Sequence, residues 1–139
     1  MNIIPLDRFQ HLATDLIGLP YVHGGRSPRG GFDCWGLVWY CYKQIGIDIA
    51  EPTDYSTRST FEQKSHVQKR LLMDHCVELD SPQPGCIVSF SRGGFAIHCG
   101  LFIDSRHGCL HATEFGIVCE KLTTIKQFRN LNAKFYIWQ

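Results

Sequence analysis

A chain of 139 residues fits one domain, residues 1–139, and its 44% hydrophobic and 19% charged residues are typical of a folded protein, which excludes a disordered one. The formal net charge of +1 and the scattered Lys and Arg residues give no electrostatic reason to expect a nucleic acid or an anionic membrane as partner. Every apolar stretch is shorter than the roughly 20 residues that span a bilayer, so we expect no membrane span.

The N-terminal part predicts two helices separated by a glycine-rich loop. Apolar residues recur at helical spacing over residues 6–17 and Gly18 follows them, which predicts a first amphipathic helix. Residues 20–33 form a loop by composition. We expect a second helix at about residues 34–45, because Asp33 can cap its start and an apolar stripe follows.

The C-terminal part changes from helix to strand. Residues 50–59 are polar and irregular, and a third helix is expected at about residues 60–74. After a Pro- and Gly-containing turn, the sequence predicts short strands at 86–90, 97–103, 108–112, 116–121 and 134–138. Helices followed by a meander of strands argue for an α+β domain with an antiparallel sheet.

The cysteines indicate reduced thiols. Their number, seven, is odd, their spacings form no paired framework, and the N-terminus lacks the basic and long apolar regions of a signal peptide, so we expect a cytosolic redox state. A zinc site is the competing idea, but the chain has no Cys-x-x-Cys pair. The densest group of candidate ligands also lacks structural-zinc spacing: Cys86, His98, Cys99, Cys109 and His111. The sequence therefore predicts no metal and no cofactor.

One cysteine, Cys34, lies where the apolar pattern of the second predicted helix begins. The unpaired N–H groups and partial positive charge of a helix N-terminus favour the thiolate, which is the nucleophilic form. We therefore interpret Cys34 as a catalytic nucleophile that is rich in thiolate near neutral pH. Four other cysteines are interpreted as small buried hydrophobic residues: Cys41, Cys76, Cys99 and Cys109. Four glycines before Cys34 are either loop hinges or positions where a substrate backbone approaches the thiolate: Gly24, Gly25, Gly30 and Gly31.

Two histidines can supply the base that a cysteine nucleophile needs. His98 begins one predicted strand and His111 lies near the end of the next, with a short turn between them, so a hairpin is expected. If the register places the two side by side, one can act as the base for Cys34 while the other fixes its tautomer through a ring hydrogen bond. A lone histidine on a strand is more often structural, so the interpretation depends on all three residues together.

Taken in order, these segments resemble the NlpC/P60 family of papain-like cysteine peptidases. The nucleophile segment of that family is similar to residues 20–38, Pro-Tyr-Val-His-Gly-Gly-Arg-Ser-Pro-Arg-Gly-Gly-Phe-Asp-Cys-Trp-Gly-Leu-Val. Its turn into the first sheet strand resembles residues 84–90, its base-bearing strand resembles 97–103, and the strand with its third catalytic residue resembles 110–112. The resemblance covers essentially the whole chain, residues 6–138.

The resemblance implies a papain-like fold in which the N-terminal helices pack on an antiparallel sheet. It implies a cysteine endopeptidase that acts on the stem peptides of bacterial peptidoglycan, beside a γ-D-glutamyl bond to a diamino acid. The implied catalytic residues are Cys34, His98 and His111. Tyr21 is implied beside the oxyanion together with the backbone N–H of Cys34, and Asp33 and Gly31 are expected near the substrate or the oxyanion.

Several positions depart from the usual family pattern. Trp35 follows the cysteine where many members have serine, and the run Asp-Cys-Trp-Gly at 33–36 is similar to the version found in bacteriophage tail-tip proteins. His23 stands where an aromatic residue is frequent, and Cys86 where an aspartate commonly follows Pro-Gly, which bears on substrate preference. The resemblance therefore favours a phage or prophage tail-tip component, made in the bacterial cytoplasm and acting in the cell wall, with other tail-tip proteins as partners.

Three alternatives stay open at this point. The chain could be a structural tail assembly subunit with a vestigial site, although the presence of Cys34, His98 and His111 argues against this. It could be an antibacterial amidase effector injected into competing bacteria, which a compact chain without a signal peptide also permits. It could be an acyltransferase on the same fold.

Overall fold

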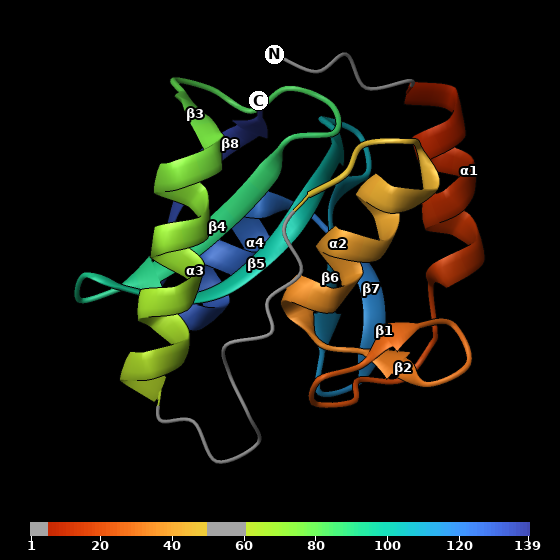
Figure 1. Cartoon of the computed structure of the whole chain (residues 1–139), viewed down its shortest axis with the longest axis horizontal. Coiled ribbons are helices and arrows are strands. Elements are labelled where there is room, and N and C mark those ends of the chain that lie inside the picture. Colours follow the sequence, from red (N-terminus) through yellow and green to blue (C-terminus); the bar gives the residue numbers. More distant parts are fainter. Residues whose placement is uncertain (1–5, 50–60) are drawn as a thin grey trace.

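The computed structural model describes residues 6–49 and 61–139 (Figure 1). The elements before the gap are α1 (Leu6–Leu16), β1 (Arg26–Ser27), β2 (Gly31–Phe32) and α2 (Cys34–Gln44). The elements after it are α3 (Phe61–His75), β3 (Cys76–Leu79), β4 (Ile87–Arg92), β5 (Phe95–Asp104), β6 (Gly108–Thr113), β7 (Gly116–Glu120), α4 (Leu122–Arg129) and β8 (Asn132–Trp138). In this part of the chain no helix is both long and apolar enough to cross a membrane.

Most predicted elements are confirmed, with small differences at their ends. The helices expected from periodicity are α1, α2 and α3, and the expected strands are β4 to β8. Four elements were not predicted: β1 and β2 lie inside the expected loop at residues 20–33, and β3 and α4 were not expected at all. Strands of two residues are too short to show alternation, and the residue before α4, Lys121, makes no side-chain capping bond, so the usual start signal is missing. The irregular stretch expected at residues 50–59 lies outside the described residues.

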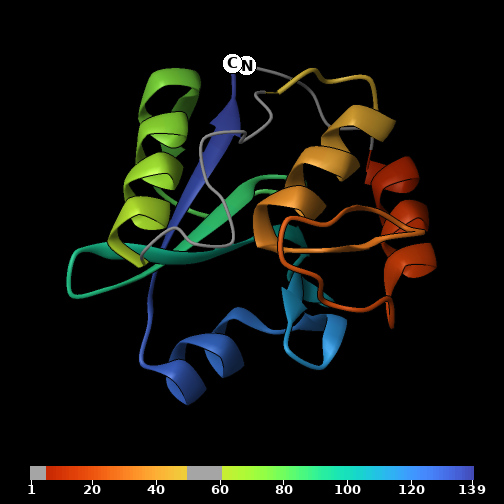
Figure 2. The same cartoon turned by 60° about the horizontal axis from the view of Figure 1, so that its bottom comes forward.

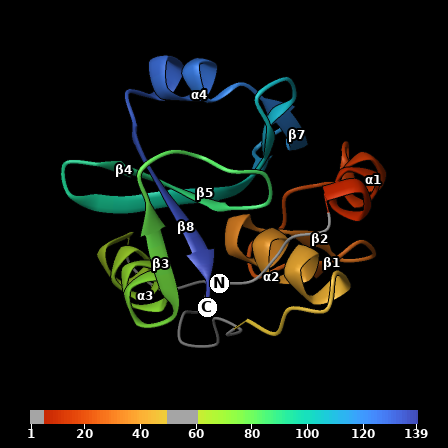
Figure 3. The ribbon, with the colours of Figure 1, turned by 90° about the horizontal axis from the view of Figure 1, so that it is seen from above.

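The main sheet has the strand order β3-β8-β4-β5-β6-β7, and every adjacent pair is antiparallel. Strands β4 to β7 follow one another as a meander, as expected. The last strand departs from that expectation, because α4 leads the chain back so that β8 lies between β3 and β4 (Figure 3). The predicted α+β class with an antiparallel sheet is confirmed.

Helices cover both faces of this sheet. Figure 3 shows α2 and α3 on one side of the strands and α4 on the other. The core divides in the same way, since Ile87 of β4 joins the cluster of Leu37 on α2, while the next residue, Val88, joins the cluster of Ile125 on α4. Side chains of a strand alternate between its faces. Two adjacent apolar residues therefore serve two separate cores.

The start of α2 is fixed by its cap and by close packing of the preceding loop. Asp33 Oδ1 accepts a hydrogen bond from the N–H of Gly36 at 2.7 Å, which caps the helix. Gly36 has to lack a side chain, because a Cβ there would overlap the carbonyl oxygen of Gly25. Figure 2 shows the β1–β2 hairpin beside α1 and against the start of α2. Cys34, the first residue of α2, is therefore positioned by the Asp33 cap and by the packing of the preceding loop against the helix.

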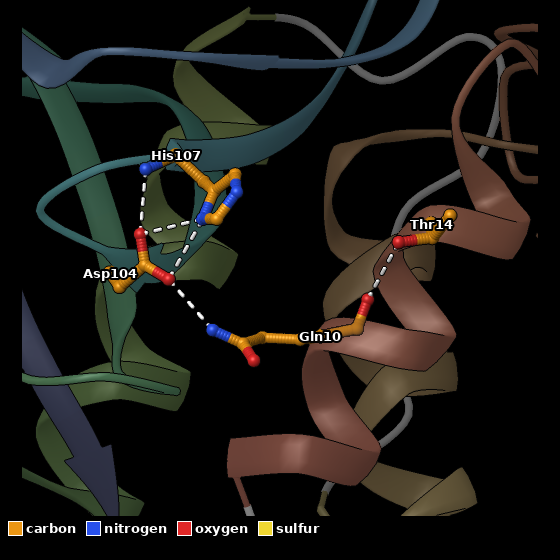
Figure 4. A network of polar contacts seen from close by, with 4 residues as sticks. All are labelled: Gln10, Thr14, Asp104 and His107. Atoms are coloured by element: carbon orange, nitrogen blue, oxygen red, sulfur yellow. Dashed lines mark hydrogen bonds and ion pairs between the residues drawn. The ribbon is translucent and has the colours of Figure 1, made fainter.

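A polar network ties α1 to the turn between β5 and β6 (Figure 4). Gln10 Nε2 donates to Asp104 Oδ2 at 2.7 Å, and Asp104 Oδ1 accepts from the backbone N–H of His107 at 2.6 Å. The Nδ1 atom of His107 lies 2.9 Å from both carboxylate oxygens. On the helix itself, Thr14 Oγ1 donates to the carbonyl oxygen of Gln10 at 3.0 Å. The closed end of the β5–β6 hairpin is thus fastened to the first helix.

Candidate active site

Cys34 is the first residue of α2, so it lies at the helix end where backbone N–H groups lack helical partners. The residue is partly exposed. Asp33 is 3% exposed, and its carboxylate oxygens accept from the N–H groups of Gly36 at 2.7 Å and Gly24 at 3.0 Å. Asp33 therefore holds the loop and the helix together through its carboxylate. Its expected place near the substrate or the oxyanion stays a prediction.

Gly31 also belongs to the framework. It is buried with φ of +83°, and a Cβ there would lie 2.8 Å from the carbonyl oxygen of Pro20 and 2.6 Å from Cγ2 of Val22. The segment that comes close to the Cβ position of this glycine is therefore the protein's own chain. Such crowding and a positive φ both require glycine. The expected place of Gly31 near the substrate or the oxyanion stays a prediction.

Tyr21 lies near Cys34, as expected. An isolated β-bridge to Phe32 holds its backbone two residues before the cysteine, and its side chain is 41% exposed. Burial of the hydroxyl and the charge of Cys34 raise the pKa of Tyr21 to about 12. The hydroxyl therefore keeps its proton near neutral pH and can donate a hydrogen bond close to the sulfur.

Strands β5 and β6 form the expected hairpin and bring His98 and His111 together. The ladder pairs Leu101 with Leu110, and beyond this pair Nε2 of His98 lies 2.8 Å from Nδ1 of His111. The rings meet edge-on with centroids 5.1 Å apart, and His111 is 0% exposed. Gly100 makes room for this contact, because a Cβ there would lie 2.9 Å from Cβ of His111. The two imidazoles are thus joined by a hydrogen bond that is largely shielded from water.

His98 is held by neighbours on two other elements. Its partner in β4 is Phe90, whose ring stacks on the imidazole at 5.6 Å between centroids. From α3, Gln68 Nε2 lies 3.1 Å from both the carbonyl oxygen of His98 and Oγ of Ser89 and donates to them. The sequence predicted this helix from its narrow apolar face alone. A polar residue on such a helix gives no signal of function, so Gln68 was not among the predicted site residues.

The neighbours of Cys34 acidify its thiol. A hydrogen bond from the thiol of Cys99 is the largest influence that lowers the pKa of Cys34 well below its usual range, and the hydrogen bond and charge of His98 lower it further. Burial and the charge of Asp33 oppose this effect without outweighing it. Burial, followed by the interaction with Cys34, raises the pKa of Cys99 well above its usual range. Cys34 is the thiol that ionises, because it lies at a helix N-terminus beside an imidazole while Cys99 is sealed in the core.

Cys99 therefore has a neighbour that the sequence did not reveal. We expected a small buried hydrophobic residue, and its exposure is indeed 0%. The structure adds the hydrogen bond from its thiol to the sulfur of Cys34. The sequence contains one signal that Cys99 could lie near the site, because it directly follows His98. The contact of its thiol with Cys34 became visible only through the packing of α2 against β5.

A carboxylate lies beside the ring nitrogen of His111 that does not face His98. Glu120 Oε1, on β7, lies 3.4 Å from Nε2 of His111. The register explains this contact: His111 pairs with Val118, and Cys109 pairs with Glu120, so all four side chains project from the same face of the hairpin. The sequence predicts this hairpin but not its register, so Glu120 was not among the expected site residues.

The comparison with protein families agrees with this arrangement. A family model described as the NlpC/P60 family matches residues 18–131, a range that includes Tyr21, Cys34, His98 and His111. The chain belongs to the NlpC/P60 family.

Relatives of this NlpC/P60 chain include proteins named as a murein endopeptidase and as a glutamyl hydrolase. It is 66% identical over 29 residues to murein DD-endopeptidase MepH of Escherichia coli (strain K12), which is 21% of this chain and 11% of that protein. It is 39% identical over 81 residues to gamma-DL-glutamyl hydrolase of Bacillus subtilis (strain 168), 58% of this chain and 16% of that protein. The chain thus spans a small part of the length of either relative.

A solved structure confirms the NlpC/P60 fold. The crystal structure of the NlpC/p60 domain of the peptidoglycan hydrolase SagA superposes with a TM-score of 0.62 at 21% sequence identity. The superposition covers 96% of this chain and 100% of that domain.

This NlpC/P60 site has the parts that nucleophilic acyl transfer requires. An acidified thiol contacts one imidazole, and a second imidazole contacts the first from behind, which is the order of nucleophile, base and orienting group. The start of α2 at Cys34 leaves backbone N–H groups without helical partners, and such groups can stabilise an oxyanion that forms beside the sulfur. Among residues 6–49 and 61–139, no three His, Cys, Asp or Glu side chains gather as a metal-ligand group.

Proposed function

We propose that this chain is a cysteine endopeptidase that hydrolyses the stem peptides of bacterial peptidoglycan at a γ-D-glutamyl bond to a diamino acid. The observation that carries the proposal is the contact of His98 with both Cys34 and His111 in an NlpC/P60 chain. The names of two relatives, a murein endopeptidase and a glutamyl hydrolase, support this substrate class.

The first half of the proposed reaction is formation of a thioester. The Cys34 thiolate attacks the amide carbonyl carbon, and the resulting oxyanion accepts hydrogen bonds from the backbone N–H of Cys34 and the hydroxyl of Tyr21. His98 holds the proton that left the thiol and gives it to the nitrogen of the leaving amine as the C–N bond breaks. In other enzymes, removing one oxyanion donor costs roughly 3–4 kcal/mol of transition-state stabilisation.

The second half releases the acid. Water attacks the thioester carbon while His98 takes a proton from it, and the thiolate leaves as the carboxylic acid forms. His111 keeps the His98 ring in place through the 2.8 Å contact, so one nitrogen remains directed toward the sulfur.

A tail-tip role is the finer part of the proposal. It is supported by the similarity of the Asp-Cys-Trp-Gly run to the version in phage tail-tip proteins. Trp35 is 3% exposed, so this residue packs in the core beside the nucleophile and does not line a substrate surface. In this proposal the chain is made in the bacterial cytoplasm and acts in the cell wall with other tail proteins. Mass spectrometry of purified phage or tail particles from the producing strain should detect the chain, and its absence from them would refute this role.

Purified muropeptides and defined stem peptides provide the test of activity. Wild-type protein should release two fragments by hydrolysis, Cys34→Ala should release none, and Cys41→Ala should behave as wild type, since Cys41 is a buried residue of the same helix. Nil release from wild type and Cys34→Ala alike would favour a structural tail subunit with a vestigial site. Cleavage at another amide of the wall would fit the amidase effector, and acyl exchange without hydrolysis would fit an acyltransferase; either result contradicts the proposal.

A further inference from the structure

We infer that Glu120 is a positioning residue: through His111, its carboxylate determines which ring nitrogen of His98 is left to receive a proton from Cys34. The catalytic meaning of this inference rests on the proposed function, whereas the proton arrangement itself does not. The residues that carry it lie on three consecutive strands, β5, β6 and β7.

The first step is the contact of the carboxylate with a buried ring. Glu120 Oε1 lies 3.4 Å from Nε2 of His111, whose side chain is 1% exposed, while that of Glu120 is 39% exposed. A lone pair on Nε2 facing a carboxylate would be repelled, whereas a proton on that nitrogen is attracted. Burial of the imidazole strengthens this preference, because solvent screens it poorly.

The second step follows from the shared hydrogen bond between the rings. Nε2 of His98 and Nδ1 of His111 are 2.8 Å apart, so one of these two nitrogens carries the proton and the other accepts it. A neutral imidazole carries one proton. With that proton on Nε2 of His111, next to Glu120, Nδ1 of His111 becomes an acceptor, and the proton between the rings belongs to His98.

The third step reaches the nucleophile. Because Nε2 of His98 carries a proton and is engaged by His111, the nitrogen available to Cys34 is Nδ1. In the neutral ring Nδ1 is an acceptor, so it can take the proton of the Cys34 thiol and later give it to the leaving amine. Without the carboxylate, His111 can hold its proton on Nδ1 and donate to His98, which leaves the wrong nitrogen of His98 unprotonated.

The position of Glu120 suits this role because the backbone around it is fixed. Glu120 pairs with Cys109 at the end of the β6–β7 ladder. A Cβ at Gly108 would overlap the carbonyl oxygen of Glu120, so the two strands are in close contact at this point. The carboxylate is therefore presented from a strand, not from a loose loop.

Imidazole nitrogen NMR of the histidine-labelled full chain tests the inference without turnover. In wild type, His111 should appear as the tautomer with a proton on Nε2, and its signals can be assigned by their loss in His111→Gln. Glu120→Ala should shift the population toward the Nδ1–H tautomer. Glu120→Gln should retain more of the Nε2–H form, because its amide oxygen can still accept from Nε2.

The matched control is Glu114→Ala, which removes an exposed carboxylate from the β6–β7 turn and should leave the His111 tautomer unchanged. An unchanged tautomer in Glu120→Ala would overturn the inference. If that variant fails to fold, Glu120→Met keeps most of the side-chain volume but has only a weak acceptor, so it should shift the tautomer in the same direction, and an unchanged tautomer in it would likewise overturn the inference. With a stem peptide, Glu120→Ala should lower kcat/KM roughly tenfold, by analogy with partners that orient a reactive ligand. A wild-type chain that shows the expected tautomer but cleaves no stem peptide would refute the proposed function and support the inference.

Discussion

The β5–β6 hairpin carries a histidine network at each end, and the two networks differ in burial and in partners. At the open end, His111 is 0% exposed and hydrogen-bonds to the imidazole of His98, which in turn meets the thiol of Cys34. At the closed end, the His107 side chain is 54% exposed and meets the carboxylate of Asp104 (Figure 4).

The difference teaches that burial and partner, not residue type, decide what a histidine does. An exposed imidazole beside a carboxylate is screened by water, and such pairs contribute at most about 1 kcal/mol. In a buried pair of imidazoles beside a thiol, the neighbouring groups decide which ring nitrogens carry protons. This decides which nitrogen can accept a proton from the thiol. The closed end therefore fastens the turn, whereas the open end is equipped for proton transfer.

Replacing one histidine at each end should separate the two networks most strongly. His98→Ala removes the base beside Cys34 and should lower kcat/KM for a stem peptide by roughly 10²- to 10⁴-fold. His107→Ala should leave kcat/KM at the wild-type level, because it touches only the turn network. Steady-state kinetics with far-ultraviolet circular dichroism as the fold check would measure this. A similar loss in both variants would contradict the comparison.

The orienting histidine should have the next largest effect. His111→Ala removes the acceptor for Nε2 of His98 and should lower kcat/KM on the order of 100-fold, less than loss of the base itself. His111→Asn should retain more activity, because its amide oxygen can accept the same proton. Kinetics of the two variants, with thermal unfolding to confirm that both fold, provide the measurement. Equal activity of His111→Ala and wild type would show that the contact between the rings has no role in turnover.

A smaller effect is expected from the thiol behind the nucleophile. The hydrogen bond from Cys99 lowers the pKa of Cys34, so Cys99→Ala should move the midpoint of Cys34 alkylation to higher pH, and Cys99→Ser should move it less. Cys41→Ala is the matched control, since Cys41 is equally buried and its replacement should leave the midpoint unchanged. Either alanine variant should lose about 1 kcal/mol of stability. Iodoacetamide rates followed against pH, with peptide mapping of Cys34, would decide; coincident midpoints for all variants would exclude the hydrogen bond.

The smallest effect should come from the closed end. Burial opposes ionisation of Asp104, but hydrogen bonds from His107 and Gln10 outweigh it and lower the pKa of this carboxyl. A carboxyl with a lowered folded-state pKa stabilises the fold above its unfolded value of about 3.9, and this stabilisation disappears as pH falls through the folded-state pKa. Asp104→Asn should therefore lose less than about 1 kcal/mol at pH 7, retain full activity, and differ less from wild type below pH 4. Urea unfolding across that pH range provides the check, and a difference that grows on acidification would contradict the assignment.

Local signals account for most of what could be predicted. The helix at Cys34 follows from a capping aspartate and an apolar stripe, both within a short window. Where the local signal was weak, prediction failed: α4 has no side-chain cap, and β1 and β2 are too short to alternate. The contacts of Asp33 and Gly31 were not predicted for a related reason, because the groups that surround them come from the loop folding back on itself.

The amino-acid sequence by itself determined the types of α1 to α3 and of β4 to β8, the place of Cys34 at a helix start and the hairpin that carries His98 and His111. Only the tertiary structure decided that β8 enters between β3 and β4, that Cys99 meets the nucleophile and that Glu120 meets His111. The physical reason is the range of the forces involved. Capping and periodicity act among residues a few positions apart, whereas hydrogen bonds between distant strands and helices depend on register and packing, which the whole core sets together.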